Sequence, residues 1–302
     1  MSSLLARAVY GTLARTGLPA LRRRRRGGAP VFCFHDVVPG EHAPVGEASL
    51  HMTEARFREL LDWMAATYTV VPLEELAGRV RAGRSLAGLA AVTFDDGCRG
   101  VYRHAAPALR AAGVPATSFV VSSAPDEGAF FWWDRLAHEG MLDPETRTRC
   151  LEELRGEGSV VLPTLLGGDA RSTPELPDLL RPAPWETVVE GEADGLAAES
   201  HTVSHPNLTR LSADELADEL TRSRRAIGER IGRAPEALSY PYGFASPRVV
   251  DAARSAGYTT AVTLEPRPVH AGDDPLALPR LNVPASVALP VLECWAAGIR
   301  IR

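Results

Sequence analysis

The stretch AVTFDDGCRG, residues 91–100, places two adjacent carboxylates directly after an apolar, β-prone run. The residues from Leu89 to Phe94 have the composition of a strand that is buried on both faces of a parallel sheet. Asp95 and Asp96 would then follow the carboxyl end of that strand, where α/β proteins collect ligands and catalytic groups. A solvated turn is the simpler interpretation of Asp-Asp-Gly taken alone. The choice between them depends on whether a partner lies elsewhere in the chain.

Composition limits the class of protein. A chain of 302 residues with 45% hydrophobic residues can bury the core of one α/β barrel or of two smaller domains. The net charge of −5 argues against a general nucleic-acid binder. Four scattered cysteines without a Cys-x-x-Cys pair favour free thiols in a reducing compartment over a zinc knuckle or a disulfide framework.

The N-terminal segment, residues 1–28, reads MSSLLARAVYGTLARTGLPALRRRRRGG. Arg7 and Arg15 interrupt its apolar run, so it does not match a secretory signal, and no apolar stretch of the chain has the length of a membrane span. A solvated or docked helix is favoured over an amphipathic helix on an anionic membrane. We therefore expect a cytoplasmic protein, in which the run Arg22–Arg26 could give weak peripheral contact with the inner membrane surface.

From Pro30 onward, strand-like and helix-like stretches alternate, which predicts βα units around a parallel sheet. The expected fold is a distorted (β/α) barrel, forming a single catalytic domain over residues 29–302. The predicted strands are 30–37, 69–73, 89–94 and 115–121, and the predicted helices are 53–68, 73–83 and 101–112.

The alternation stops at about residues 122–183, where proline and glycine recur. We expect an irregular insertion beside a site, because long connections in compact domains are usually functional. The insertion contains FFWWD, residues 130–134. Local core is the favoured role for these aromatic rings, and Trp133 is the candidate for a substrate contact.

The sequence ESHTVSHPNLTRLS, residues 199–212, supplies a partner for the carboxylates. His201 and His205 follow a strand-like run, and Ser212 with Glu215 forms a capping box that starts a helix only downstream. Both imidazoles are therefore expected on a loop at the ligand-binding edge of the sheet. A His-x-x-x-His pair is a weak signal by itself. Two imidazoles and a carboxylate from another strand, however, match an open hydrolytic metal centre.

The chain resembles the polysaccharide deacetylases of carbohydrate esterase family 4, which share the chitooligosaccharide-deacetylase homology domain. The resemblance covers about residues 30–290 and rests on three motifs in the family's order: TFDDG at 93–97, SHTVSHPNLTRLS at 200–212 and YPYG at 240–243. It implies a distorted (β/α) barrel and a metal-dependent hydrolase that removes acetyl groups, with N-acetyl favoured, from a carbohydrate or glycoconjugate precursor. The sequence SYPYG resembles the poly-N-acetylglucosamine deacetylase branch.

The resemblance also implies roles for residues of the first two motifs. Asp95 matches the family's general base, while Asp96, His201 and His205 match the ligands of one divalent metal ion, for which Zn²⁺ is expected. A cation held by Asp96 would offset the repulsion between the two adjacent carboxylates and keep Asp95 ionised.

In the third motif, the resemblance implies that the backbone N–H of Tyr242 helps to hold the oxyanion. Pro241 and Gly243 would fix that loop beside the substrate.

The sequence departs from the family pattern at two positions. Many members have an arginine where this chain has Ser239, and LALPRLNV, residues 276–283, lacks the histidine that often serves as general acid. His35, in the strand PVFCFHDV, is the candidate substitute proton donor, with a purely structural histidine as the equal alternative. His51 and His104 are expected to be surface residues.

Two other functions stay open. One is a metal-dependent hydrolase of a non-sugar C–N bond, and the other is a catalytically silent sugar-binding relative. The presence of Asp95, Asp96, His201 and His205 together counts against the second. The expected partner is an acetylated carbohydrate and not a nucleic acid.

Overall fold

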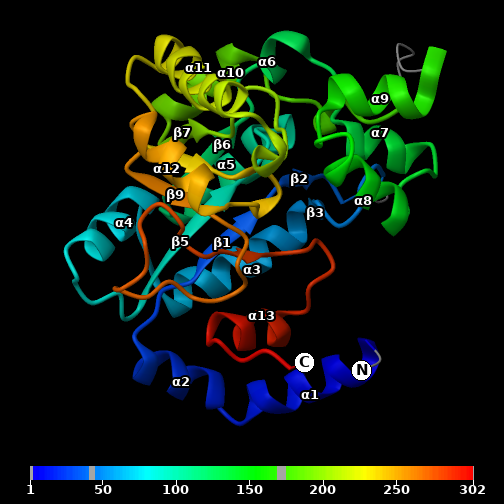
Figure 1. Ribbon diagram of the computed structural model, residues 1–302. Coiled ribbons are helices and arrows are strands. Elements are labelled where there is room, and N and C mark those ends of the chain that lie inside the picture. Colours follow the sequence, from blue (N-terminus) through cyan, green and yellow to red (C-terminus); the bar gives the residue numbers. More distant parts are fainter. Residues whose placement is uncertain (1–2, 41–44, 169–174, 302) are drawn as a thin grey trace.

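A parallel sheet forms the centre of the molecule (Figure 1). The computed structural model describes residues 3–40, 45–168 and 175–301. Within these residues, eight parallel strands pair in the order β10-β1-β5-β6-β7-β8-β9, with β4 also paired to β5. The strands are β1 (Val31–Phe34), β4 (Thr69–Val70), β5 (Leu89–Phe94), β6 (Ala116–Val120), β7 (Leu196–Ser200), β8 (Ala237–Ser239), β9 (Thr260–Val262) and β10 (Leu281–Asn282). All six residues of β5 are buried, as the apolar run before the two aspartates predicts.

One short segment, residues 278–282, connects the two edges of the curled sheet. At one end, Leu278 forms a parallel bridge with Val262 of β9. At the other end, β10 pairs with Phe32 and Cys33 of β1. The sheet therefore curls into the distorted (β/α) barrel that the alternation of elements predicts.

Helices cover the sheet at the positions that the sequence signals predict. Thr53 caps α3 by accepting a hydrogen bond from the backbone N–H of Arg56, and Ser212 with Glu215 forms a complete capping box on α11. Gly113 ends α5 with a φ of 64°. These helices are α3 (Glu54–Thr67), α4 (Leu73–Arg81), α5 (Ala106–Ala112), α10 (Trp185–Ala193), α11 (Ala213–Ile231) and α12 (Pro247–Ser255).

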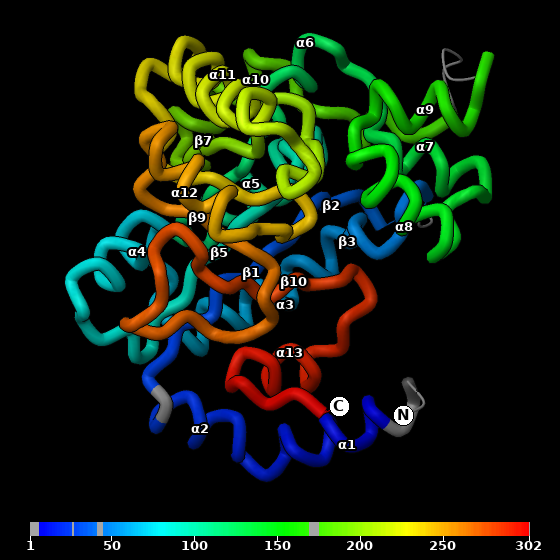
Figure 2. The backbone as a smooth tube through the Cα atoms, in the orientation of Figure 1, coloured from blue at the N-terminus to red at the C-terminus, as the bar shows by residue number. Residues whose placement is uncertain are grey.

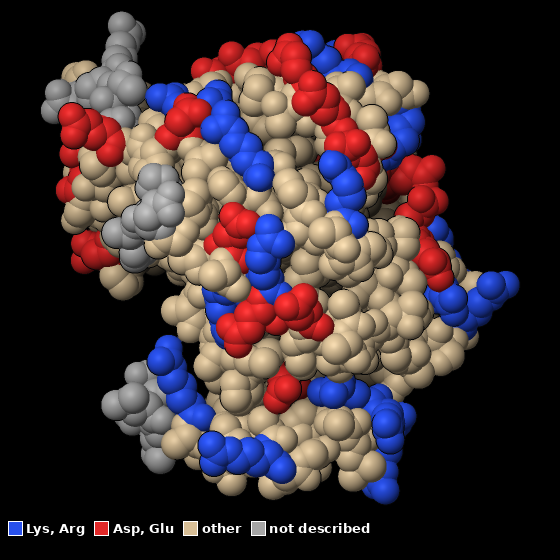
Figure 3. Space-filling view, turned by 180° about the vertical axis from the view of Figure 1, so that it is seen from behind, with Lys and Arg blue, Asp and Glu red and all other residues tan. Residues whose placement is uncertain are grey.

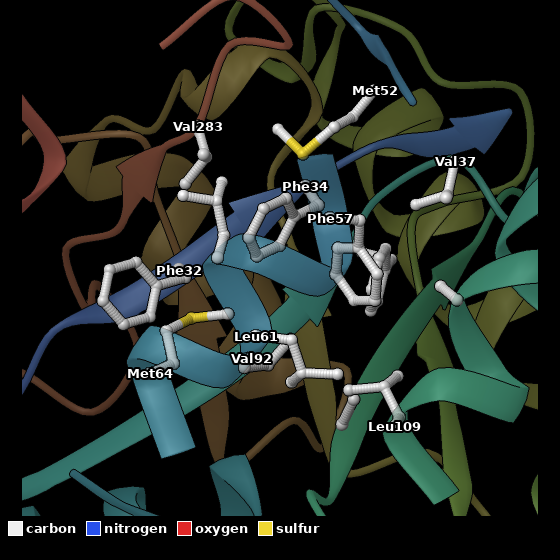
Figure 4. Packing of buried hydrophobic residues seen from close by; sticks show 14 of the residues in the cluster. Phe32, Phe34, Val37, Met52, Phe57, Leu61, Met64, Val92, Leu109 and Val283 are labelled. Atoms are coloured by element: carbon white, nitrogen blue, oxygen red, sulfur yellow. The ribbon is translucent and has the colours of Figure 1, made fainter. Parts of the chain in front are cut away.

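An aromatic core joins β1 and β5 to α3 (Figure 4). Phe34, Phe57 and Phe94 are almost completely buried, and the centroids of their rings lie 5.4–5.7 Å apart. This packing fixes the carboxyl ends of two neighbouring strands, which are the ends that carry the polar residues of the site.

The two ends of the described chain pack together below the sheet (Figure 2). The helix α1 (Ser3–Arg15) lies along α13 (Leu289–Ala296), and α2 (Leu18–Arg26) leads into β1. The hydroxyl of the buried Tyr10 accepts hydrogen bonds from the indole N–H of Trp295 and the backbone N–H of Ile301. No helix within the described ranges has both the length and the apolar character needed to cross a membrane. The cytoplasmic location stays a prediction.

The described part of the segment expected to be irregular contains four short α-helices and a 3-10 helix at Asp178–Leu180, while residues 169–174 lie outside the described residues. Its prolines and glycines mark helix ends. Asp143 caps α8 just before Pro144, and Gly128 closes α6 with a φ of 60°. The helices are α6 (Ala124–Glu127), α7 (Trp132–His138), α8 (Pro144–Glu152) and α9 (Gly158–Leu166). The domain boundaries at residues 28–29 and the limits of the insertion stay predictions.

Candidate functional site

The polar residues singled out in the sequence meet at the carboxyl edge of the sheet. Asp95 and Asp96 follow β5, and His201 follows β7. His35 lies between β1 and the short strand β2 (Asp36–Val38), which pairs with β3 (His51–Thr53). Three loops from separate parts of the sequence thus contribute to one buried site.

Three side-chain atoms point toward a common centre. Asp96 Oδ1 lies 3.5 Å from Nε2 of His201 and 3.5 Å from Nε2 of His205, and the two nitrogens are 3.0 Å apart. All three residues are at least 95% buried. One carboxylate oxygen and two imidazole nitrogens are a donor set that suits a divalent transition metal, and they leave coordination positions free.

The protonation states also fit a cation. Nδ1 of His201 lies 2.8 Å from the carbonyl oxygen of Ser239, which can only accept, so the proton is on Nδ1 and the Nε2 lone pair faces the centre. Burial lowers the pKa of both imidazoles, which keeps them neutral. Burial and the neighbouring charge of Asp95 raise the pKa of Asp96, an unfavourable arrangement for an anion that a bound cation would relieve.

Asp95 is held by an arginine that the sequence analysis did not identify. Nη1 of Arg280 donates to Oδ1 of Asp95 at 2.7 Å, and Nη2 donates to Oδ2 at 2.7 Å. Such a bidentate pair orients both carboxylate oxygens. The Ser239 hydroxyl lies 2.8 Å from Nη2 of Arg280 and donates to Asp95 at 3.1 Å. Arg280 thus contacts Asp95 beside Ser239, where the family resemblance places an arginine in many members.

Arg280 is fully buried and comes from the segment that connects the sheet edges. Its Nε donates to the carbonyl of Thr263 and its Nη1 to the hydroxyl of Thr93. The guanidinium lies over the ring of Phe119, 5.5 Å from the centroid. Every polar edge of the guanidinium is therefore used, as burial of a charge requires.

The charge of Arg280 decides the ionisation of Asp95. Burial alone would raise the pKa of Asp95, but the charge and hydrogen bonds of Arg280, together with the neighbouring imidazoles of His201 and His35, hold that pKa well below its usual range. Asp95 is thus ionised whether or not a cation is bound. The Cys33 thiol, 3.5 Å from Oδ2 of Asp95, stays protonated because burial raises its pKa, and it donates to the carboxylate.

His35 lies near Asp95. A ring nitrogen of His35, the Cys33 sulfur and a carboxylate oxygen of Asp95 all lie within 4.8 Å of one another. Burial lowers the pKa of His35 to about 4, so this imidazole is neutral near pH 7. The structure therefore brings the candidate proton donor beside the candidate base, and its catalytic role stays a prediction.

Two features shape the loop between His201 and His205. The carboxylate of Glu219 on α11 accepts hydrogen bonds from the backbone N–H groups of Val203 and Ser204. His205 adopts a φ of 60°. Four of the five described non-glycine residues with positive φ lie in the site, so its backbone departs locally from the usual conformations. These four are Asp96, Thr202, His205 and Tyr242.

The third motif packs against the second. The Tyr242 hydroxyl lies 2.9 Å from the carbonyl of Gly156, 3.2 Å from that of His205 and 3.1 Å from the indole nitrogen of Trp132, whose N–H it accepts. A side chain at Gly243 would put Cβ 2.6 Å from that of Leu264, so only glycine fits this turn. Pro241 is buried at the start of the same turn.

Trp133 is 4% exposed and packs between Phe131 and His205, with ring centroids 4.6 and 4.9 Å away. This placement supports the local-core interpretation. Trp133 and His205 nevertheless line a pocket of about 330 Å³ between α6, α7 and α9. Contact between Trp133 and a substrate stays a prediction.

The prediction that His51 is a surface residue is wrong. The side chain is 2% exposed and lies between two buried carboxylates, with Nδ1 3.2 Å from Asp36 and Nε2 2.7 Å from Asp134. Burial would lower the pKa of His51, but hydrogen bonds to the two carboxylates raise it to about 10. A buried imidazolium thus joins β2, β3 and α7. His104 is partly exposed and pairs with Glu54.

Comparison with known proteins identifies the family. The family model for polysaccharide deacetylases matches residues 83–261, more than half of the chain. The chain is 20% identical over 256 residues to the polysaccharide deacetylase YxkH of Bacillus subtilis (strain 168), covering 84% of this chain and 71% of YxkH.

Two solved structures share the fold. IcaB from Ammonifex degensii superposes with a TM-score of 0.61 at 22% identity, covering 90% of this chain and 97% of IcaB. The de-N-acetylase from Aggregatibacter actinomycetemcomitans gives a TM-score of 0.63 at 20% identity, covering 88% of this chain and 99% of that one.

Replacing Arg280 by methionine is expected to destabilise the fold by about 3–5 kcal/mol, because Asp95 is left as a buried, unpaired charge. The double variant Asp95→Asn/Arg280→Met should regain much of that loss. Urea denaturation of both single variants, the double variant and the parent completes a double-mutant cycle. Strictly additive changes in the free energy of unfolding would contradict the pairing.

The buried imidazolium predicts a specific pH dependence. Because the folded pKa of His51 is raised, its contribution to stability is complete below the unfolded pKa of about 6.5 and is lost as the pH rises through about 10. The stability advantage over His51→Gln should therefore shrink between neutral and alkaline pH. Chemical denaturation across this range measures the advantage, with His104→Gln as the partly exposed control. A constant difference would show that His51 is not protonated in the fold.

Proposed function

This chain belongs to the polysaccharide deacetylase family, and on that premise we propose that it is a metal-dependent hydrolase that removes acetyl groups from a carbohydrate. The observation that carries the proposal is the meeting of Asp96, His201 and His205 around one point beside the ionised Asp95. The donor set supports a single divalent cation, and Zn²⁺ suits two imidazoles with one carboxylate. When bound, such a cation supplies Lewis acidity, which polarises a carbonyl oxygen and lowers the pKa of water.

We assign Asp95 the role of general base. Its pairing with Arg280 keeps the carboxylate ionised and oriented, so it is ready to accept a proton from the attacking water. The same pairing lowers the pKa of Asp95 and so makes the carboxylate a weaker base. A proton that Asp95 accepts from water is therefore readily transferred to the leaving group.

The remaining roles follow from position. His35, neutral and near Asp95, is placed to relay a proton toward the leaving amine. The backbone N–H of Tyr242 is the proposed donor to the oxyanion, in a turn fixed by Pro241 and Gly243. The pocket beside Trp133 is the proposed place for part of the substrate next to the reacting acetyl group.

We propose an N-acetylated sugar in a polymer or glycoconjugate precursor as the substrate, and the fold shared with a de-N-acetylase supports the choice of nitrogen. Acetate release from N-acetylglucosamine oligomers, O-acetylated sugars and small cyclic amides separates this proposal from a hydrolase of non-sugar C–N bonds. Acetate from N-acetylated oligomers alone is the expected result. Tight binding of those oligomers with no acetate release would identify a silent sugar-binding relative.

The first functional prediction concerns metal content. His205→Ala should lose most of the bound divalent metal because one of three ligands is gone, while His104→Ala should keep it because the partly exposed His104 pairs with Glu54 and is not in the ligand group. Elemental analysis of proteins equilibrated with Zn²⁺ and then desalted measures the effect. Equal metal content in the parent and in His205→Ala would rule out this ligand set.

Asp95→Asn tests the division of work between the two aspartates. This variant should retain the metal and lose turnover by about a hundredfold or more, the usual scale for loss of a general base. Steady-state acetate release is measured alongside the metal content of the same preparation. Circular dichroism confirms that the variant folds, because the substitution leaves Arg280 buried without its carboxylate partner. If the folded variant loses metal and activity together, Asp95 is a ligand and the assignment of the pair has to be reversed.

A further inference from the structure

The N-terminal helices concentrate positive charge. Residues 1–35 contain seven arginines and no aspartate or glutamate, although the chain as a whole has a net charge of −5. The rest of the chain contains the other 26 basic residues and all 38 acidic residues, a net charge of −12, so the N-terminal stretch differs from it in being purely basic. Segregation of this kind creates a local field that attracts anions.

The arginines are fixed to the body of the protein. The Tyr10 hydroxyl on α1 accepts one hydrogen bond from Trp295 of α13 and one from Ile301, which lies beyond that helix. Helix α2 ends at Gly27, with a φ of 63°, four residues before β1. Pro19 on α2 is buried. The arginines thus lie on helices that pack against α13, and Figure 1 shows α1, α2 and α13 next to one another.

Several of these arginines have no acidic partner. Arg15, Arg24 and Arg25 are exposed, and no ion pair with a described carboxylate involves them. Arg23 instead packs over the ring of Tyr68. In Figure 3, basic atoms gather over α1 and α2 at the bottom of the molecule, while acidic atoms lie mainly above them. Their charge is therefore available to a partner.

Two exposed leucines lie on the same helix as the arginines of α2. Leu18 is 38% exposed and Leu21 is 47% exposed, and they are two of only four large hydrophobic side chains exposed in the described part of the chain. With Arg25 they follow the spacing i, i+3, i+7, which places them on one face of α2. We use the name basic face for these three residues together with two exposed neighbours, Arg24 on α2 and Arg15 at the end of α1.

We propose that the basic face docks on an anionic lipid bilayer. Arginines attract the headgroups, and the leucines insert into the apolar layer just beneath them. A nucleic acid or a free phosphate matches the charge but offers no apolar layer to the leucines. The basic face connects to the amino end of β1, whereas the catalytic site lies at the carboxyl end of the sheet, so docking leaves the site edge free. This inference is independent of the proposed chemistry.

Vesicle sedimentation of the full chain tests the docking. The protein should bind phosphatidylglycerol/phosphatidylcholine vesicles at low salt and dissociate from them at high salt. It should not bind vesicles of pure phosphatidylcholine. Arg24→Glu/Arg25→Glu should weaken partitioning by about tenfold or more, since each basic residue near an anionic surface contributes several-fold. The control is Arg222→Glu/Arg225→Glu, which reverses two exposed arginines three residues apart on α11. Equal loss in both variants, or none in the first, would overturn the proposal.

A second pair of variants separates a bilayer from other polyanions. Leu18→Ser/Leu21→Ser keeps every charge, and it should weaken vesicle binding several-fold while leaving any binding to a duplex oligonucleotide unchanged. Circular dichroism and melting curves confirm that all variants fold. Vesicle binding that survives loss of the leucines, together with equally tight binding of the oligonucleotide, would show a general polyanion site and overturn the lipid assignment.

Discussion

The bidentate pair between Asp95 and Arg280 is the interaction on which the rest of the site depends. A buried carboxylate at the end of a central strand would be protonated or would disrupt the fold without a matching cation. Arg280 supplies this cation, and its remaining donors are held by Ser239, Thr263 and Thr93. Because the pair is satisfied within the protein, the adjacent Asp96 is left as the carboxylate that still needs a positive partner. Asp95 is therefore neutralised by a charge within the protein, whereas Asp96 is available to a bound cation.

A second group of charges lies next to the first. Asp36 and Asp134 add two more buried carboxylates, and His51 lies between them as an imidazolium. The group links the first strands to α7, which also presents Trp133 to His205. Each buried anion near the site thus has an identified positive partner or a place where a cation fits. Such compensation allows four carboxylates to sit in one low-dielectric region.

Local sequence patterns correctly predict the features that depend on neighbouring residues. The strand before Asp95 has the predicted bounds, the capping box of α11 forms as expected, and the two histidines meet the second aspartate. Arg280 and His51 were missed because their roles depend on partners 185 and 83 residues away, and no local pattern marks such pairs. The helices of the insertion were missed for a different reason, since their prolines and glycines serve as caps but read as loop residues.

The segment that joins the two edges of the sheet also sets an order of events during synthesis. Asp95 emerges from the ribosome long before Arg280, so a nascent chain that has made most of its strands still lacks the counter-charge for its central carboxylate. The same late segment is followed by α13, against which the earliest helix packs. Segments that are far apart in the sequence must therefore find each other before the fold is stable, a contact pattern of high sequence separation. A ribosome-bound chain that stops short of this segment would expose an unpaired sheet edge, which makes it a natural client for chaperones.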